Sequence, residues 1–127
     1  MIEVVLAVGI TAFILISVFG MTAVAVKGTR EADINSRLTQ IGRLEASLSQ
    51  LAHFSNYVGS LPATNYFNQE SAPVDATAGD TYYRCDLINV TPPGMSTNLV
   101  LVQLQVRWPV PQLAYTNTTI LSLVKYD

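Results

Sequence analysis

The chain opens with a long, uninterrupted apolar run. From Val4 to Val26 no residue is charged, and the polar residues are two threonines and one serine. A helix of that length would reach roughly 34 Å, whereas the hydrocarbon core of a bilayer is roughly 30 Å thick. Backbone polar groups inside lipid need internal partners, so the pattern predicts a membrane-spanning helix over residues 1–26. Its large apolar side chains are Val4, Val5, Leu6, Val8, Ile10, Phe13, Ile14, Leu15, Ile16, Val18 and Phe19.

From Lys27 onward the pattern becomes amphipathic. Apolar residues recur every three or four positions, and charged or amide residues lie between them, which is typical of one face of a helix. No proline precedes Pro62, so the two stretches predict a single long helix that ends near Tyr57. The apolar stripe of its second half, expected to form a core with a sheet, consists of Ile34, Leu38, Ile41, Leu44, Leu48 and Leu51.

The remaining chain predicts a loop over 58–80, with Tyr66-Phe67 as a short strand or a contact on the helix, followed by strands at about 81–90, 98–108 and 118–126. In the second of these strands apolar residues alternate with Gln103, Gln105 and Arg107, as in a half-buried strand. Proline-containing connections suit the hairpins of an antiparallel meander. The expected core residues of this strand are Val100, Val102, Leu104, Val106 and Trp108.

These elements define an α+β class. A long N-terminal helix, membrane-spanning in its first half and amphipathic in its second, is expected to pack against a small antiparallel sheet of three to four strands. The chain therefore divides into a membrane segment, 1–26, and a globular domain, 27–127, with its helix over 27–57. At 127 residues the chain has room for one such domain besides the membrane segment.

Composition excludes several function classes. Half of the residues are apolar and the formal net charge is −2, so no nucleic-acid binding is expected. The single cysteine excludes an internal disulfide. Glu70, Asp75 and Asp80 do not have the dense alternating spacing of a calcium loop, and we interpret them as solvated loop acids.

The sequence offers few residues that could form a catalytic site. Cys85 and the only histidine, His53, are the candidates for a nucleophile and a base, but a buried inert cysteine and a surface histidine are the commoner arrangement. One histidine and one cysteine offer no metal-ligand cluster, and no glycine-rich phosphate loop is present. We therefore expect no enzyme activity, no metal and no cofactor.

Glu3 is the one charge at the head of the apolar run. An acid there could simply favour the helix dipole at a membrane surface. A signal peptide would need a basic start and a shorter apolar core. A third interpretation comes from resemblance: IEVVLAVGI and the apolar run after it resemble the beginning of type IV pilins and pseudopilins. The matching residues are Ile2, Glu3, Val4 and Val5.

The resemblance implies a pilin-like fold and a filament subunit. It implies that Glu3 sets the register between subunits by pairing with the N-terminal amine of a neighbour, inside a core formed by the apolar helix residues named above. It also implies other pilin-like subunits, a prepilin peptidase, an assembly ATPase and a platform protein as partners. The mature N-terminus would be methylated.

Pilins carry a short basic leader that is cleaved after a glycine. We expect the leader, that glycine and about two mature residues to be missing before Met1, which would explain why Lys27 and Arg30 follow the span while no basic residue precedes it. The expected location is then the bacterial inner membrane, single-pass, with the C-terminal domain outside the cytoplasm, and later a periplasmic or extracellular filament.

The order of the strands sharpens the resemblance. YYRCDLINV, VLVQLQVRWP and TILSLVKY are similar to a verrucomicrobial pilin-like family called cassette protein B, and more loosely to the I-type minor pseudopilins of type II secretion. This favours a minor over a major subunit. The alternative hypothesis is a bitopic membrane protein that does not polymerise and whose small domain binds a ligand or partner.

Overall fold

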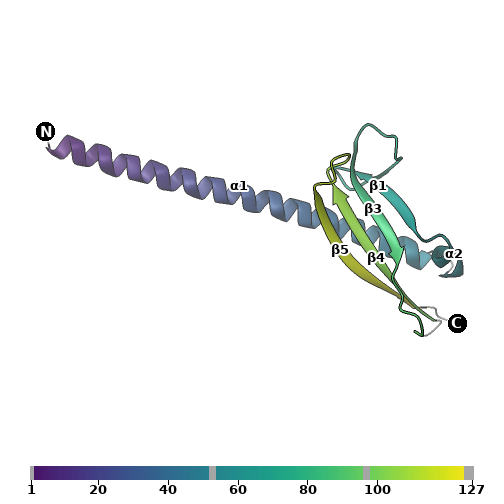
Figure 1. Cartoon of the computed structure of the whole chain (residues 1–127). Coiled ribbons are helices and arrows are strands. Elements are labelled where there is room, and N and C mark those ends of the chain that lie inside the picture. Colours follow the sequence, from purple (N-terminus) through teal and green to yellow (C-terminus); the bar gives the residue numbers. More distant parts are fainter. Residues whose placement is uncertain (1, 52–53, 96–97, 125–127) are drawn as a thin grey trace. The chain divides into compact units, whose positions relative to one another are not determined.

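The computed structural model describes residues 2–51, 54–95 and 98–124. The described residues form one long helix, one short helix and five strands (Figure 1). In chain order these are α1 (Ile2–Leu51), α2 (Phe54–Gly59), β1 (Ala63–Asn68), β2 (Pro73–Val74), β3 (Thr81–Asn89), β4 (Leu99–Trp108) and β5 (Tyr115–Val124). The predicted α+β class, with a long N-terminal helix packed against a small antiparallel sheet, is confirmed. The chain divides into two compact units, Met1–Ser36 and Arg37–Asp127.

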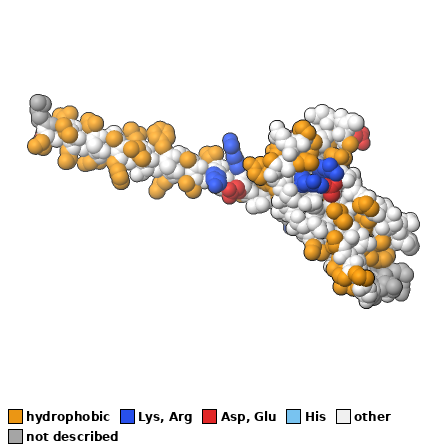
Figure 2. Space-filling model, in the orientation of Figure 1, with side chains coloured by type: hydrophobic (Ala, Val, Ile, Leu, Met, Phe, Trp, Pro, Cys, Tyr) orange, Lys and Arg blue, Asp and Glu red, His pale blue; other side chains and the backbone are white. Residues whose placement is uncertain are grey.

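The first unit is the apolar part of α1. Its side chains are exposed from Ile2 through Asp33, and hydrophobic groups follow one another along the face shown in Figure 2. Threonine hydroxyl groups in this unit donate hydrogen bonds to backbone carbonyls of the same helix. Thr11 Oγ1 donates to the carbonyl of Ala7 at 2.8 Å, and Thr22 Oγ1 donates to the carbonyl of Phe19 at 2.9 Å. These threonine hydroxyls are thus satisfied within the helix itself.

The second unit is built on a five-stranded antiparallel sheet in the order β2-β1-β3-β4-β5. One face of the sheet packs against α1 from Arg37 onward (Figure 1). β4 alternates between buried and half-buried residues along its whole length. The buried apolar residues of the sheet are Phe67, Tyr83, Cys85, Leu87 and the five predicted β4 residues Val100, Val102, Leu104, Val106 and Trp108.

The helix face against the sheet differs from the predicted apolar stripe. Ile41, Glu45 and Ser49 are the buried residues of α1, and each follows the last by four positions. Of the predicted stripe, Ile34, Leu38 and Leu44 are half-buried. Leu48 and Leu51 are 47% and 84% exposed, so their assignment to the helix–sheet core is wrong.

The reason is the phase of the helix. Each residue turns the helix by about 100°, so Leu48 lies about 100° and Leu51 about 160° from the buried position of Ser49. The predicted stripe advances mostly by threes and drifts off the face that the sheet covers. A glutamate and a serine occupy the covered positions instead.

The segment predicted as a loop over 58–80 is the other correction. It contains β1 and β2, so the sheet has five strands, whereas three to four were predicted. β1 pairs with β3 through contacts such as Asn65 with Cys85 and Phe67 with Tyr83, and Phe67 is buried. The sequence ATNYFN lacks a strong apolar alternation, because one of its faces meets Asp86 and Arg84 of β3.

Element boundaries also shift. Helical residues run to Leu51 in α1 and from Phe54 to Gly59 in α2. The join at residues 52–53 lies outside the described chain, so a single helix to residue 57 stays a prediction there. β5 begins at Tyr115 rather than 118, and the predicted end of this strand at 126 falls among residues that are not described. Tyr115 pairs with Trp108 in register, and their rings stack at 5.9 Å.

Candidate functional site

The apolar half of α1 is the largest exposed hydrophobic surface of the first unit. All eleven apolar residues expected to line a membrane or filament core, from Val4 to Phe19, are more than half exposed. Glu3 stands in the first turn of the helix and is also exposed. The helix is long and apolar enough to cross a membrane. Large exposed apolar surfaces are typical of segments that contact lipid or other proteins.

A second feature lies in the globular unit, where α1 meets β1. Glu45 is only 1% exposed, and its Oε1 accepts a hydrogen bond from Asn65 Nδ2 at 2.7 Å. Beside it is a groove of about 350 Å³ between α1, β1 and the segment 73–76. The groove is lined by Leu44, Glu45, Leu48, Thr64, Asn65, Tyr66, Phe67, Pro73, Val74, Asp75 and Ala76.

Burial governs the electrostatics around Glu45. Loss of water raises the pKa of Glu45, and the Asn65 hydrogen bond opposes that effect only in part. Burial, with the nearby Glu45 carboxylate, raises the pKa of Tyr57 on α2 to about 12. The Tyr57 hydroxyl has no hydrogen-bond partner among the described residues. Glu45 is therefore an acid in an apolar junction with few polar contacts.

Asp86 forms a contrasting site on the opposite face of the sheet. Its Oδ1 accepts hydrogen bonds from Thr64 Oγ1 at 2.8 Å and from Arg84 Nε at 3.0 Å, and its Oδ2 accepts one from Arg107 Nη2. Burial alone would raise the pKa of Asp86, but the hydrogen bonds from Thr64, Arg107 and Arg84 outweigh it and lower the pKa. Because Arg84 and Arg107 are cross-strand partners, the negative charge of Asp86 also offsets the repulsion between two like charges.

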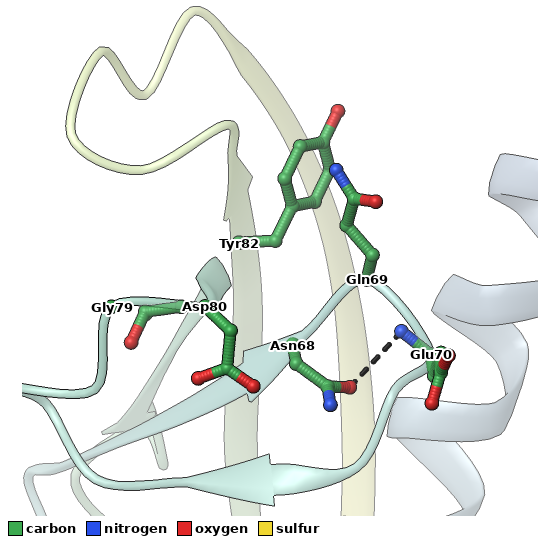
Figure 3. A pocket seen from close by; sticks show the side chains of 7 residues that line it. Asn68, Gln69, Glu70, Gly79, Asp80 and Tyr82 are labelled. Atoms are coloured by element: carbon green, nitrogen blue, oxygen red, sulfur yellow. Dashed lines mark hydrogen bonds between the residues drawn. The ribbon is translucent and has the colours of Figure 1, made fainter.

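A shallow depression lies where the turn after β1 meets the start of β3 (Figure 3). It has a volume of about 470 Å³ and contains Glu70 and Asp80, which lie on either side of Asn68 in Figure 3. The Asn68 side-chain oxygen accepts hydrogen bonds from the backbone N–H groups of Glu70 and Ala72, so it serves the turn. Asp75 lines the groove near Glu45 instead. Of the three loop acids, Glu70 and Asp80 therefore line one depression, and Asp75 lines another groove.

Cys85 lies in the sheet core. It is fully buried in β3, and burial raises the pKa of its thiol well above its usual range, with Glu45 and Asp86 adding to the effect. A thiol that stays protonated is a poor nucleophile. His53, the base considered for it, lies outside the described residues. In the part of the chain that is described, no group of three or more His, Cys, Asp or Glu side chains could hold a metal ion.

The two buried acids were not predicted as site residues. Asp86 falls on the same face of its strand as Tyr82 and Arg84, so alternation places it with arginine but does not indicate burial. Glu45 falls between apolar positions and resembles any solvent-facing helix residue. Their partners Thr64 and Asn65 lie in the stretch predicted as a loop, so no pairing could be inferred.

Fold and site together define an α+β protein with one long apolar N-terminal helix. Comparisons with known protein families, with curated protein sequences and with solved structures found no match.

Proposed function

We propose that the chain is a structural subunit, a pilin or minor pseudopilin, of a type IV pilus-like or type II secretion-like filament. The observation that carries the proposal is α1: 50 continuous helical residues, apolar and exposed in the first half, with Glu3 as the only acid in its first turn. The second half belongs to a small α+β domain. This combination suits a subunit that is stored in a membrane and then moved into a bundle of like helices.

The proposed role of Glu3 follows from its apolar surroundings in a membrane or filament core. A carboxylate in hydrocarbon is costly unless it is paired, so pairing with a cation from a neighbour favours one register between subunits. The cation in this proposal is the neighbour's N-terminal amine. Partners would be other pilin-like subunits, a prepilin peptidase, an assembly ATPase and a platform protein. The subunit would have no catalytic role.

Localisation follows the same argument. The apolar half of α1 would hold the subunit in a bacterial inner membrane, with the domain outside the cytoplasm. Assembly would then carry it into a periplasmic or extracellular filament. The modest size of the domain favours a minor subunit.

Substitution of Glu3 tests the proposal in the native host. Glu3→Ala should abolish filament incorporation, measured in sheared surface fractions, while the subunit remains in the membrane. Glu31→Ala is the matched control, because Glu31 is another exposed acid of α1 and forms an ion pair with Lys27, four residues away. Unchanged incorporation of Glu3→Ala would remove the proposed role of Glu3.

The N-terminal peptide provides a second measurement. Mass spectrometry of the membrane fraction should find a processed chain with a methylated terminal amine. An unprocessed chain together with indifference to Glu3→Ala would identify a bitopic protein that does not polymerise.

A further inference from the structure

The last strand of the sheet, β5, is an open edge (Figure 1). Among the described strands it pairs with β4 on one side, and no strand pairs with it on the other. Leu121 and Leu123 are half-buried, and the rest of the strand is exposed. The backbone N–H and C=O groups along its outer side can therefore pair with another strand.

The sequence of β5 lacks the features that usually keep an edge strand from pairing. Natural edges carry charged side chains or prolines, or are very short. β5 has ten residues, and none of them is charged or a proline. The opposite edge of the sheet is β2, which has two residues, one of them Pro73. A β5 edge that meets a β2 edge would form only a short ladder, whereas two β5 edges can form a long one.

The side chains on one face of β5 indicate which strand fits against it. Alternate residues share a face, and the face that β5 shares with Gln103 of β4 contains Ile120. In either direction from Ile120, this face presents first a hydroxyl side chain and then a β-branched one. In order along the strand the residues of this face are Thr116, Thr118, Ile120, Ser122 and Val124. The pattern is thus nearly the same in both directions, which suits an antiparallel pair of identical strands.

Such a pair has a two-fold axis at Ile120, where this side chain lies opposite its own copy. Thr118 of each copy then lies opposite Ser122 of the other, and the two hydroxyl groups can form a hydrogen bond across the pair. Ile120 is 63% exposed in the single chain, so contact with its copy removes apolar surface from water. Because β5 carries no charge, no like charges of the two strands oppose each other.

We propose that β5 is a self-association surface, at which two copies of the chain pair antiparallel in the register centred on Ile120. The contact joins the two five-stranded sheets into one. The same surface serves both copies, so the assembly closes as a dimer. The surface lies within the globular unit, so the inference goes beyond the filament proposal and does not depend on it.

Cysteine cross-linking of the full chain in zwitterionic detergent micelles tests the contact. A short thiol-specific cross-linker should join Ile120→Cys to its copy at least about tenfold faster than Ile88→Cys, because directly opposed side chains are held side by side. Ile88 is the matched control, since it is an exposed isoleucine on the same face of the sheet, two strands from the edge. The unsubstituted chain, in which Cys85 is buried, gives the background rate.

A mixture of two further variants tests the register. Thr118→Cys mixed with Ser122→Cys should give a product that links position 118 to position 122. Neither variant should cross-link rapidly when it is alone, because identical positions would then lie four residues apart along the ladder, about 14 Å. Rapid cross-linking of Thr118→Cys with itself would overturn the proposed register.

A charge at the two-fold axis tests the association itself. Ile120→Lys places two ammonium groups opposite each other, so the dissociation constant of the dimer should rise by at least about tenfold, as measured by sedimentation at several chain concentrations. Ile88→Lys should leave this constant unchanged. The amide spectrum of each variant checks its fold. A monomeric unsubstituted chain, an unchanged dimer of Ile120→Lys, or equal cross-linking of Ile120→Cys and Ile88→Cys would each overturn the proposal.

Discussion

Asn65 on β1 donates its side-chain amide hydrogen to Glu45 on α1 across 2.7 Å, inside the junction of helix and sheet. This is a polar contact in the middle of an apolar interface, since Ile41 one turn earlier and Phe67 two residues along β1 are both buried. A buried carboxyl group with one neutral donor is stabilised most when it is protonated. The stability of the helix–sheet junction should therefore depend on pH through the protonation of Glu45.

The first prediction concerns this dependence. Burial raises the pKa of Glu45 in the folded chain above its ordinary value of 4.5. For an acid with a raised folded pKa, the unfolded chain loses the proton first as pH rises. The stability contribution of protonated Glu45 is therefore complete below about pH 4.5 and is lost as pH rises from there through the folded pKa.

Glu45→Gln should remove this loss and raise the free energy of unfolding of the globular unit at pH 7. Two groups feel the charge of Glu45: Tyr57, with a pKa of about 12, and Cys85, whose pKa burial also raises, so neither changes charge in this range. Urea unfolding in micelles at several pH values between 4 and 8 provides the measurement. A variant that is less stable than the unsubstituted chain at pH 7 would show that ionised Glu45 is well accommodated.

The second prediction concerns Asp86. Asp86→Ala should destabilise the chain by about 2 kcal/mol, because it removes charge-assisted hydrogen bonds and leaves Arg84 opposite Arg107, both partly exposed to screening water. Asp80→Ala, an exposed loop acid, should stay within about 0.5 kcal/mol. Thermal or urea unfolding compares the two variants.

The same site has a pH dependence of opposite sign to that of Glu45. The folded pKa of Asp86 is lowered from 3.8, so its contribution is present above about pH 3.8 and is lost as pH falls through the folded pKa. This acid-side loss should be absent in Asp86→Ala. Persistence of the loss in that variant would assign it to other groups.

The third prediction tests the phase of α1. Ile41 is fully buried, and Ile41→Ala should cost about 2–5 kcal/mol through lost apolar contact and a cavity. Leu51→Ala should change stability by no more than about 0.5 kcal/mol, because Leu51 is 84% exposed. Equal losses from the two substitutions would contradict the observed face of the helix.

The fourth prediction concerns Cys85. Its buried, protonated thiol should not react with an aromatic disulfide reagent at pH 8 until the chain is unfolded in denaturant. A control for reagent access is a cysteine introduced at an exposed position of β5, Ser122→Cys, which should be labelled at once in the folded chain. Rapid labelling of Cys85 itself would contradict its burial.

The elements with a sustained local period could be predicted from sequence. The apolar run and the three-and-four spacing after it produce one 50-residue helix, and the alternation over 98–108 produces β4 with five inward-facing residues. Helix and strand periods arise within a short stretch of backbone, so they need no knowledge of what lies opposite.

Local sequence periods do not predict β1 or the start of β5. The sequence ATNYFN has no clear period, and it becomes a strand because β3 supplies its hydrogen-bond partners. The first three residues of β5, Tyr115 to Asn117, are exposed and polar enough to resemble a loop, yet they pair with Trp108, Arg107 and Val106. Pairing with a distant strand outweighs weak local preference.

The long helix, its apolar first half with Glu3 at the head, and the strand periods of the domain are all encoded in local sequence patterns. Three features depend on packing between distant segments: which side of α1 is buried, the place of Glu45 rather than Leu48 at the sheet, and the hydrogen bonds of Asn65 and Asp86. The physical reason is that burial and hydrogen bonding of a side chain depend on groups twenty or more residues away, whose approach no local pattern encodes.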